Sequence, residues 1–302
     1  MDLPLLRYSA MLSRRDFLRS GLAAVGSLAA SRYLFADQYI HPPLGVQLYT
    51  VRRQAEADLA PLLKQIRAIG YDEVETYWNV YSRPAKELRQ MILDAGLKVP
   101  SGHFDYQGLP AKLDYARELG VSFVICPMLP ENLRNTADDF RLAADQFNRW
   151  GERARSMGMR FGFHNHNYEF RQLGATTGFD ILVENTDPKL VCFEMDCYWV
   201  TQAGQDPVAM LQKLGNRVRM LHLKDRRQGF PPSRELNKAA EHFTEVGNGT
   251  IDWKKVLTAA ERLEVEHLFV EQDESDRPAV ESLRISYRHL IDVYLDKMGV
   301  IS

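Results

Sequence analysis

The stretch Arg160-Phe-Gly-Phe-His-Asn-His166 shows the pattern that decides the fold. It is a short, mostly apolar run that ends in polar residues, and a long amphipathic helical pattern at 136–157 precedes it. Such a run, bounded by a helix stop and polar residues, is typical of a strand buried in a parallel sheet. Further strands are expected at 190–197, 218–223 and 267–272, each followed by a helical pattern. The second half of the chain therefore predicts repeated strand–helix units.

The first half of the chain shows the same alternation. Four more strands are expected at 44–49, 73–77, 98–104 and 122–127. Helices are expected between them at 59–69, 84–95 and 109–119. Eight strand–helix units over roughly 250 residues favour a closed barrel. No Gly-x-Gly-x-x-Gly motif follows an early strand to support an open, doubly wound sheet. The predicted fold class is thus α/β, a (β/α)8 TIM barrel in a single domain.

Composition restricts the class of partner. The 302 residues are 45% hydrophobic and 26% charged, which is ordinary for a globular protein. The net charge of −2 gives no global field that would attract nucleic acid. We therefore expect a small-molecule partner and no nucleic acid, and we leave a homo-oligomer open.

The N-terminus resembles a targeting signal. Residues 13–19 read Ser-Arg-Arg-Asp-Phe-Leu-Arg, and an uncharged run of small and apolar residues follows at 21–30. Basic residues before a short apolar run predict a signal peptide rather than a membrane span. The paired arginines resemble the twin-arginine export signal. We expect a signal segment at 1–36, a barrel at 37–302, a periplasmic location and no stable membrane span after processing.

Polar side chains follow the last four expected strands, at the end where a barrel carries its active site. The residues are His164, Asp196, His222 and Glu271. Burying so many ionisable groups together is costly unless a divalent cation compensates their charge. A mixed nitrogen and oxygen ligand set suits Mn²⁺, which is our first choice, and also Co²⁺, Fe²⁺ or Zn²⁺. A metal site is therefore predicted at this rim.

Several segments together carry a resemblance to a known family. They are Leu44-Gly-Val-Gln-Leu-Tyr-Thr-Val-Arg52, Phe163-His-Asn-His-Asn-Tyr-Glu-Phe170, Met195-Asp196, Ala203-Gly-Gln-Asp-Pro207, Leu221-His-Leu-Lys-Asp225, Gly247-Asn-Gly-Thr-Ile-Asp-Trp253 and Val270-Glu-Gln-Asp273. From about Leu44 onward the chain resembles the xylose-isomerase-like TIM-barrel superfamily, or sugar phosphate isomerase/epimerase family. That superfamily also includes inosose and dehydroshikimate dehydratases.

The resemblance implies a ligand set of Glu, Asp, His and Glu from four successive strands. Asp196, His222 and Glu271 match the last three places. At the first place His164 stands where the epimerases carry a glutamate, and His166 or Glu169 are the alternatives. In the epimerases the two glutamates are also the proton-transfer pair. A histidine in one of these places favours another base, closer to the dehydratase or lyase branch.

The resemblance implies a sugar or polyol substrate and a metal-dependent isomerase or epimerase, which abstracts a proton next to a carbonyl through an enediolate. The first alternative is a keto-sugar dehydratase or lyase acting on an oxidised glycoside or an inosose-like substrate. The second is a catalytically silent sugar-binding barrel. The expected catalytic residues are Glu271, His166 and Lys224. The expected substrate-binding residues are His103, Glu75, Gln47, Glu169 and Trp199. A salt bridge for Lys224 and core packing for Trp199 are the structural alternatives.

Overall fold

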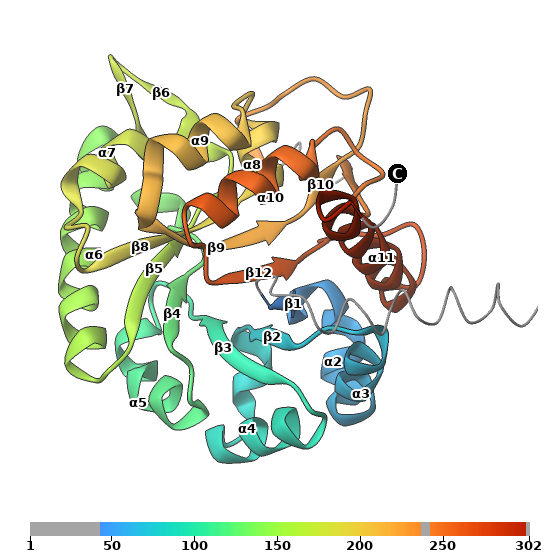
Figure 1. Cartoon of the computed structure of the whole chain (residues 1–302). Coiled ribbons are helices and arrows are strands. Elements are labelled where there is room, and N and C mark those ends of the chain that lie inside the picture. The colour runs from blue at the N-terminus through green and yellow to red at the C-terminus, as the bar shows by residue number, and fades with distance from the viewer. Residues whose placement is uncertain (1–42, 237–241, 300–302) are drawn as a thin grey trace, which may run out of the picture. The chain divides into compact units, whose positions relative to one another are not determined.

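The computed structural model describes residues 43–236 and 242–299. The expected signal segment, residues 1–36, lies outside these described residues. Within them, eight strands close into a barrel in the order β1-β12-β9-β8-β5-β4-β3-β2 (Figure 1). The strands are β1 (Leu44–Gln47), β2 (Glu73–Thr76), β3 (Lys98–His103), β4 (Phe123–Cys126), β5 (Arg160–His164), β8 (Val191–Asp196), β9 (Val218–Leu223) and β12 (His267–Val270). All neighbouring barrel strands are parallel. The predicted (β/α)8 barrel is confirmed.

Helices surround this barrel (Figure 1). Those in the described residues are α2 (Arg52–Ala57), α3 (Leu59–Ile69), α4 (Ala85–Asp94), α5 (Leu109–Leu119), α6 (Ala137–Ser156), α7 (Gly178–Asn185), α8 (Cys197–Gln202), α9 (Pro207–Leu214), α10 (Trp253–Arg262) and α11 (Ala279–Lys297). Among these helices, none combines the length and the apolar character needed to cross a bilayer.

The local sequence of helix α6 determines where the helix begins and which face it buries. Thr136 begins the helix with a capping box: its hydroxyl accepts from Asp139 N at 3.2 Å, and the Asp139 carboxylate accepts from Thr136 N at 2.8 Å. Such a cap is worth about 1 kcal/mol. The buried residues Phe140, Phe147 and Trp150 then recur at helical spacing on the face that covers the barrel.

An apolar layer closes the barrel beneath its polar rim. Phe123, Ile125, Met220 and Phe269 form a fully buried cluster. Met220 precedes His222 by two residues on β9, and Phe269 precedes Glu271 in the same way, so each pair shares a strand face. The polar residues are thereby held at the carboxyl ends of the strands, above a core that excludes water.

Gly45 on β1 makes room for this layer. A Cβ atom at that position would lie 2.5 Å from Cδ1 of Phe269, which is closer than carbon atoms approach in proteins. The glycine therefore lets the Phe269 ring fill the barrel interior, and any larger residue would displace it.

The structure departs from the sequence prediction at several places. His166 does not belong to β5, which ends at His164, because its N–H donates to the Glu169 carboxylate and the chain turns. The short helix α8 follows β8 without a loop. Two small two-stranded antiparallel sheets were also not predicted, β6–β7 (Gln172–Leu173 and Thr176–Thr177) and β10–β11 (Asp225–Arg226 and Phe243–Thr244).

Candidate metal centre and active site

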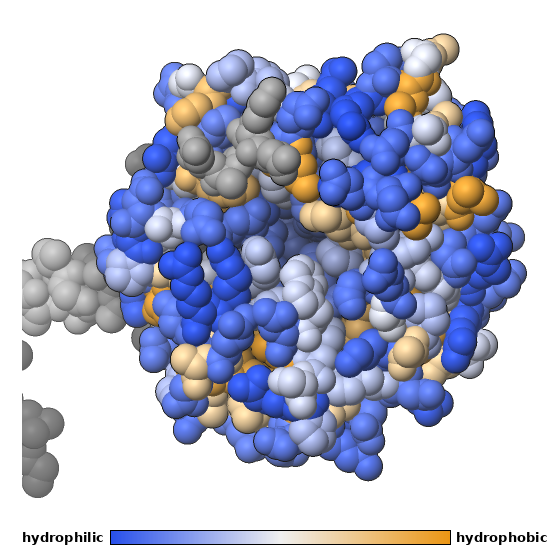
Figure 2. Space-filling view, turned by 180° about the vertical axis from the view of Figure 1, so that it is seen from behind, coloured by the Kyte–Doolittle hydropathy of each residue, from blue (hydrophilic) through white to orange (hydrophobic). Residues whose placement is uncertain are grey.

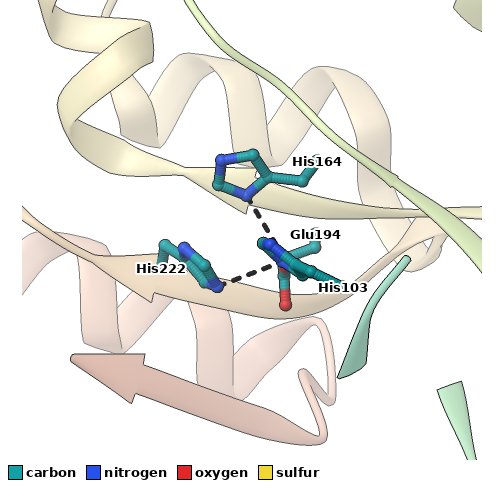
Figure 3. Close-up of side chains that lie close together, drawn as sticks. All are labelled: His103, His164, Glu194 and His222. Carbon is teal, nitrogen blue, oxygen red and sulfur yellow. Dashed lines mark hydrogen bonds and ion pairs between the residues drawn. The ribbon is translucent and has the colours of Figure 1, made fainter. Parts of the chain in front are cut away.

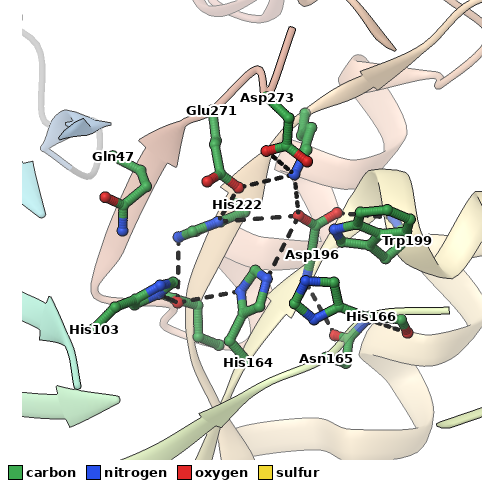
Figure 4. A network of polar contacts seen from close by, with 12 residues as sticks. Gln47, His103, His164, Asn165, His166, Asp196, Trp199, His222, Glu271 and Asp273 are labelled. Atoms are coloured by element: carbon green, nitrogen blue, oxygen red, sulfur yellow. Dashed lines mark hydrogen bonds and ion pairs between the residues drawn. The ribbon is translucent and has the colours of Figure 1, made fainter. Parts of the chain in front are cut away.

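Four buried side chains converge at the carboxyl ends of neighbouring strands (Figure 4). They are the four residues expected as metal ligands: His164, Asp196, His222 and Glu271. Each offers one nitrogen or oxygen atom, and these atoms all lie within 4.8 Å of one another. His164 ends β5 and Asp196 ends β8, while Glu271 directly follows β12. The strand register places Asp196 beside His222, so the convergence follows from the barrel itself.

Asp196 divides its two oxygens between the backbone and this centre. Its Oδ1 accepts from the Trp199 N–H at 2.8 Å, which begins helix α8. Its Oδ2 is buried and has no hydrogen-bond partner in the described residues. That atom lies 3.9 Å from both Nε2 of His164 and Nδ1 of His222. A buried carboxylate oxygen without a donor is costly, so its position fits a cation that it would bind.

The two histidines of this centre carry different charge. Burial lowers the pKa of His164 well below its usual range, and the neighbouring His222 lowers it further. Burial alone would also lower the pKa of His222, but the carboxylates of Glu194 and Glu271 raise it well above its usual range. Without a cation, His222 therefore holds a proton against these carboxylates. A metal ion would replace that proton, which is the chemistry expected of such a donor set.

A second group of side chains lies on the other side of the two imidazoles (Figure 3). Glu194 Oε2 lies 2.6 Å from His103 Nε2, 3.2 Å from His222 Nε2 and 3.3 Å from His164 Nδ1. This group is the second one that could hold a cation. Two members of each group line the cavity described below: His103 and His164 in this group, and His164 and Glu271 in the group around Asp196. Of the two groups, only the one around Asp196 brings a carboxylate, that of Glu271, to the cavity lining, and it is also the group expected from the sequence.

Glu194 was not selected from the sequence, although the signal was present. It precedes Asp196 by two residues on β8, and alternation in a strand places both on the same face. One ligand was expected from each strand, so Asp196 was chosen on β8 and Glu194 was not, although His103 and Glu75 of the same layer were expected as site residues.

Lys224 is buried and paired, and it also faces the cavity. Its Nζ lies 2.8 Å from Asp273, 3.0 Å from Glu271 and 3.7 Å from Asp196. Burial would lower the pKa of this ammonium group, but the three carboxylates raise it above its usual range. Lys224 is therefore a fixed cation at physiological pH. Lys224 therefore forms salt bridges and also lines the cavity, so a structural role and a catalytic role are compatible at this residue.

His166 lies in the loop after β5 and lines the same cavity. Its ring centroid is 5.0 Å from that of Trp199, and its Nδ1 has no hydrogen-bond partner in the part of the chain that the structure describes. Burial lowers the pKa of the imidazole well below its usual range, and the Lys224 cation lowers it further. The ring is therefore neutral at pH 7, with a nitrogen available to accept a proton.

A cavity of about 670 Å³ opens above these groups. Six of the expected site residues line it: His103, His164, His166, Trp199, Lys224 and Glu271. Figure 2 shows one face of the molecule, where hydrophilic side chains surround a hollow near the centre. The cavity thus gives a small molecule access to the candidate metal centre and to His166.

Three residues expected to bind substrate lie outside the cavity lining. Gln47 donates to Glu75 Oε2 at 2.6 Å, and Ser101 donates to Glu75 Oε1 at 2.5 Å. Glu169 accepts from His166 N at 3.0 Å, and burial raises the pKa of its carboxyl to about 7. All three expected residues, Gln47, Glu75 and Glu169, are fully buried and hold other side chains or backbone in place.

Known proteins resemble this chain in sequence and in structure. An inosose dehydratase of Geobacillus thermodenitrificans is 28% identical over 238 residues, which cover 67% of this chain and 77% of that relative. A sugar phosphate isomerase/epimerase structure from Parabacteroides distasonis superimposes with a TM-score of 0.70 at 24% identity, over 83% of this chain and 94% of that one. A protein designated IOLI, whose crystal structure contains a zinc atom, has a TM-score of 0.64 at 14% identity, over 84% of this chain and 98% of that one.

The structural neighbours share the fold, and the resemblance seen in the sequence is confirmed by a family model. The model described as xylose isomerase-like TIM barrel matches residues 63–292, which span seven of the eight barrel strands and all four strand ends that carry the candidate ligands. The chain therefore belongs to the xylose isomerase-like TIM barrel family.

Proposed function

We propose that this protein is a divalent-metal-dependent lyase that removes a β-oxygen substituent from a keto-sugar or an inosose-like cyclic polyol. The observation that carries the proposal is the pair formed by His164 and His166: an imidazole replaces the first carboxylate of the centre, and a second, neutral imidazole faces the cavity. The curated relative named inosose dehydratase supports a dehydration over the isomerisation that the sequence first suggested.

The ligands in this proposal are His164, Asp196, His222 and Glu271. Mn²⁺ is the first choice, with Co²⁺, Fe²⁺ or Zn²⁺ as the other candidates, and the zinc atom in the IOLI structure supports this class of ion. When bound, the cation would stabilise the negative charge that develops on the carbonyl oxygen of the substrate.

The chain's own residues supply the proton transfers. His166 takes the proton from the carbon next to the carbonyl, and the electron pair of that C–H bond forms the new C=C bond. The C–O bond at the β-carbon breaks, and its oxygen leaves with the bonding pair. Lys224 donates a hydrogen bond to the departing oxygen, and the His166 imidazolium returns the abstracted proton to that oxygen, which is released as water or, from a glycoside, as an alcohol.

Proton exchange in heavy water tests the proposal. The Mn²⁺-loaded protein is incubated with keto-sugars and inososes, and deuterium incorporation and the absorbance of the unsaturated ketone are followed. We expect elimination, and we expect His166→Asn to slow it by about 100-fold or more. His289→Asn on α11, outside the cavity lining, is the matched control and should retain the rate.

The alternatives predict different results in the same experiment. Deuterium exchange with an isomeric sugar and without elimination would support an isomerase or epimerase instead. Sugar binding without exchange at any carbon would support the silent sugar-binding barrel. Either result overturns the lyase.

We also propose export to the periplasm by the twin-arginine route, with a signal segment at 1–36 and the barrel domain at 37–302. The support is the sequence Ser-Arg-Arg-Asp-Phe-Leu-Arg at 13–19 and the uncharged run that follows it. Replacement of Arg14 and Arg15 by lysine should retain the protein in the cytoplasm. Recovery of that variant from the periplasm at an unchanged level would contradict the proposal.

A further inference from the structure

The cavity is larger and more apolar than a single polyhydroxylated ring requires. It measures about 670 Å³, within the range of roughly 300–1,000 Å³ that encloses drug-sized ligands. Apart from Asp105, its histidine, lysine and carboxylate groups gather around the candidate metal centre, whereas aromatic and aliphatic side chains form much of the remaining wall. These are Tyr49, Trp78, Tyr106, Met128, Leu129 and Phe243. One keto-sugar ring at the centre would leave much of this wall in contact with water.

Trp78 is the exposed part of that wall. It begins the 3-10 turn Trp78–Ser82 after β2, and 41% of its surface is exposed. Its ring lies 5.7 Å from that of Tyr49 at 42° and 5.6 Å from that of Tyr77 at 81°. Among the residues that the structure describes, no aromatic ring stacks flat on the Trp78 indole. The indole is therefore held at its position by its neighbours, with a face that a ligand can cover.

Polar groups that suit hydroxyls line the same cavity as this indole. Asp105 and Gln107 line the same cavity, follow the next strand, β3, and have exposed side chains. Neither is among the ligands of the candidate metal centre. An apolar ring face together with carboxylate and amide groups in one cavity is the combination that binds a sugar ring, whose C–H face is apolar and whose edge carries hydroxyls.

We propose that this wall is an outer subsite for a second sugar ring, so that the substrate class is an oxidised disaccharide or similar glycoside rather than a free cyclic polyol. Trp78 stacks on the outer ring, and Asp105 and Gln107 bind its hydroxyls. This inference rests on the proposed function and specifies it: the oxygen that leaves from the β-carbon belongs to the second sugar, which is released as an alcohol.

Binding measurements test this subsite without any requirement for turnover. Calorimetry on the Mn²⁺-loaded protein compares cellobiose with methyl β-glucoside, which has the same first ring and no second one. We expect cellobiose to bind about tenfold more tightly, because stacking on an indole contributes about that factor. Trp78→Ala should remove most of this preference. Leu142→Ala on α6, whose side chain is also exposed and lies outside the cavity lining, is the matched control.

Phenyl β-glucoside distinguishes a sugar subsite from a merely apolar one. The double variant Asp105→Ala, Gln107→Ala should weaken cellobiose several-fold and leave phenyl β-glucoside unchanged. Affinities for cellobiose and methyl β-glucoside within threefold of each other, no detectable binding of either, or a Trp78→Ala variant with the full preference would each overturn the inference. If cellobiose is preferred but no keto-sugar undergoes elimination, the outer subsite is supported and the proposed lyase activity is wrong.

Discussion

Glu75 Oε2 lies 2.7 Å from Nε2 of His222, across the barrel from β2 to β9. The other ring nitrogen of His222, Nδ1, lies 2.9 Å from Glu271 and 3.9 Å from Asp196. One nitrogen is therefore committed to a buried carboxylate, and the other faces the candidate metal centre. A carboxylate that holds the far nitrogen of a ligating histidine fixes the orientation of the ring and makes the near nitrogen more basic.

Removal of the Glu75 charge should weaken metal binding, although Glu75 itself is not a metal ligand. We expect Glu75→Gln to reduce Mn²⁺ affinity by about 10–100-fold, the usual effect for a partner of a ligating histidine. Calorimetric titration of the metal-free protein measures the affinity. Glu73→Gln is the matched control, because Glu73 holds His267 in the same way at 2.7 Å at the opposite end of the barrel. Equal losses in both variants would contradict the assignment.

Asp196→Asn should abolish the stabilisation of the protein by metal. The asparagine can still accept from Trp199 N and begin α8, but the charged oxygen that faces the centre is lost. We expect Mn²⁺ affinity to fall by more than about 100-fold, beyond the effect of indirect partners. In the original protein, Mn²⁺ at 100 times its dissociation constant adds about 2.7 kcal/mol of stability. Thermal melting with and without Mn²⁺ should thus show a shift that Asp196→Asn lacks.

Asp206→Asn provides the control for this experiment. Asp206 also begins a helix, α9, with its Oδ1 accepting from Val208 N at 2.8 Å, and it lies outside the candidate centre. It should keep the full metal-dependent shift. A shift that survives in Asp196→Asn would mean that the cation binds elsewhere.

The barrel was predictable because each strand and helix carries its own local signal. The helix ranges 59–69 and 109–119 agree with α3 and α5, and strand 218–223 agrees with β9. The convergence of His164, Asp196, His222 and Glu271 was predictable as well, because parallel strands end at the same edge of the barrel. These inferences need only strand alternation and closure of the sheet.

The remainder depends on tertiary contacts. His166 was placed in a strand because Phe163 and His164 continue an extended pattern, yet its backbone turns to reach the buried Glu169 carboxylate. Glu75 was expected to face a ligand, but Ser101 and His222 surround it in the interior. Strand alternation places Glu194, His103 and Glu75 near this rim, but the periodicity of one segment does not show which residues of distant strands they contact, so their partners could not be predicted.

Metal affinity should rise with pH between about 6 and 8. Burial raises the pKa of Asp196 to about 7, and its neighbours raise the pKa of His222 well above its usual range, so both hold protons near neutrality. A cation must displace these protons. For each group, metal affinity therefore rises about tenfold per unit increase in pH until the pH reaches the pKa of that group. Calorimetry at pH 6, 7 and 8, in buffers of different ionisation enthalpy, measures both affinity and proton release. A flat profile without proton release would exclude this ligand set.

Asp225 organises the segment that returns to the barrel after β9. Its Oδ2 accepts from Gly247 N at 2.9 Å, from Gly249 N at 3.2 Å and from the indole N–H of Trp253 at 2.8 Å. Gly247 has φ +95°, which favours glycine, and a Cβ at Gly249 would lie 2.1 Å from Asp225 Oδ1. The two glycines therefore let the backbone wrap closely around one buried carboxylate.

Asp225→Ala should lower the free energy of unfolding by about 3 kcal/mol, because it leaves the buried indole N–H of Trp253 and the buried backbone N–H of Arg226 without this acceptor, at about 1–3 kcal/mol each. Urea denaturation monitored by tryptophan fluorescence measures this loss. Asp252→Ala is the control in the same segment: it removes the cap of α10, where Asp252 accepts from Lys255 N, and an exposed ion pair with the Lys255 ammonium group, and should cost about 1 kcal/mol. If the two variants lost equal stability, Asp225 would be an ordinary turn residue, and the close approach of Gly249 would need another explanation.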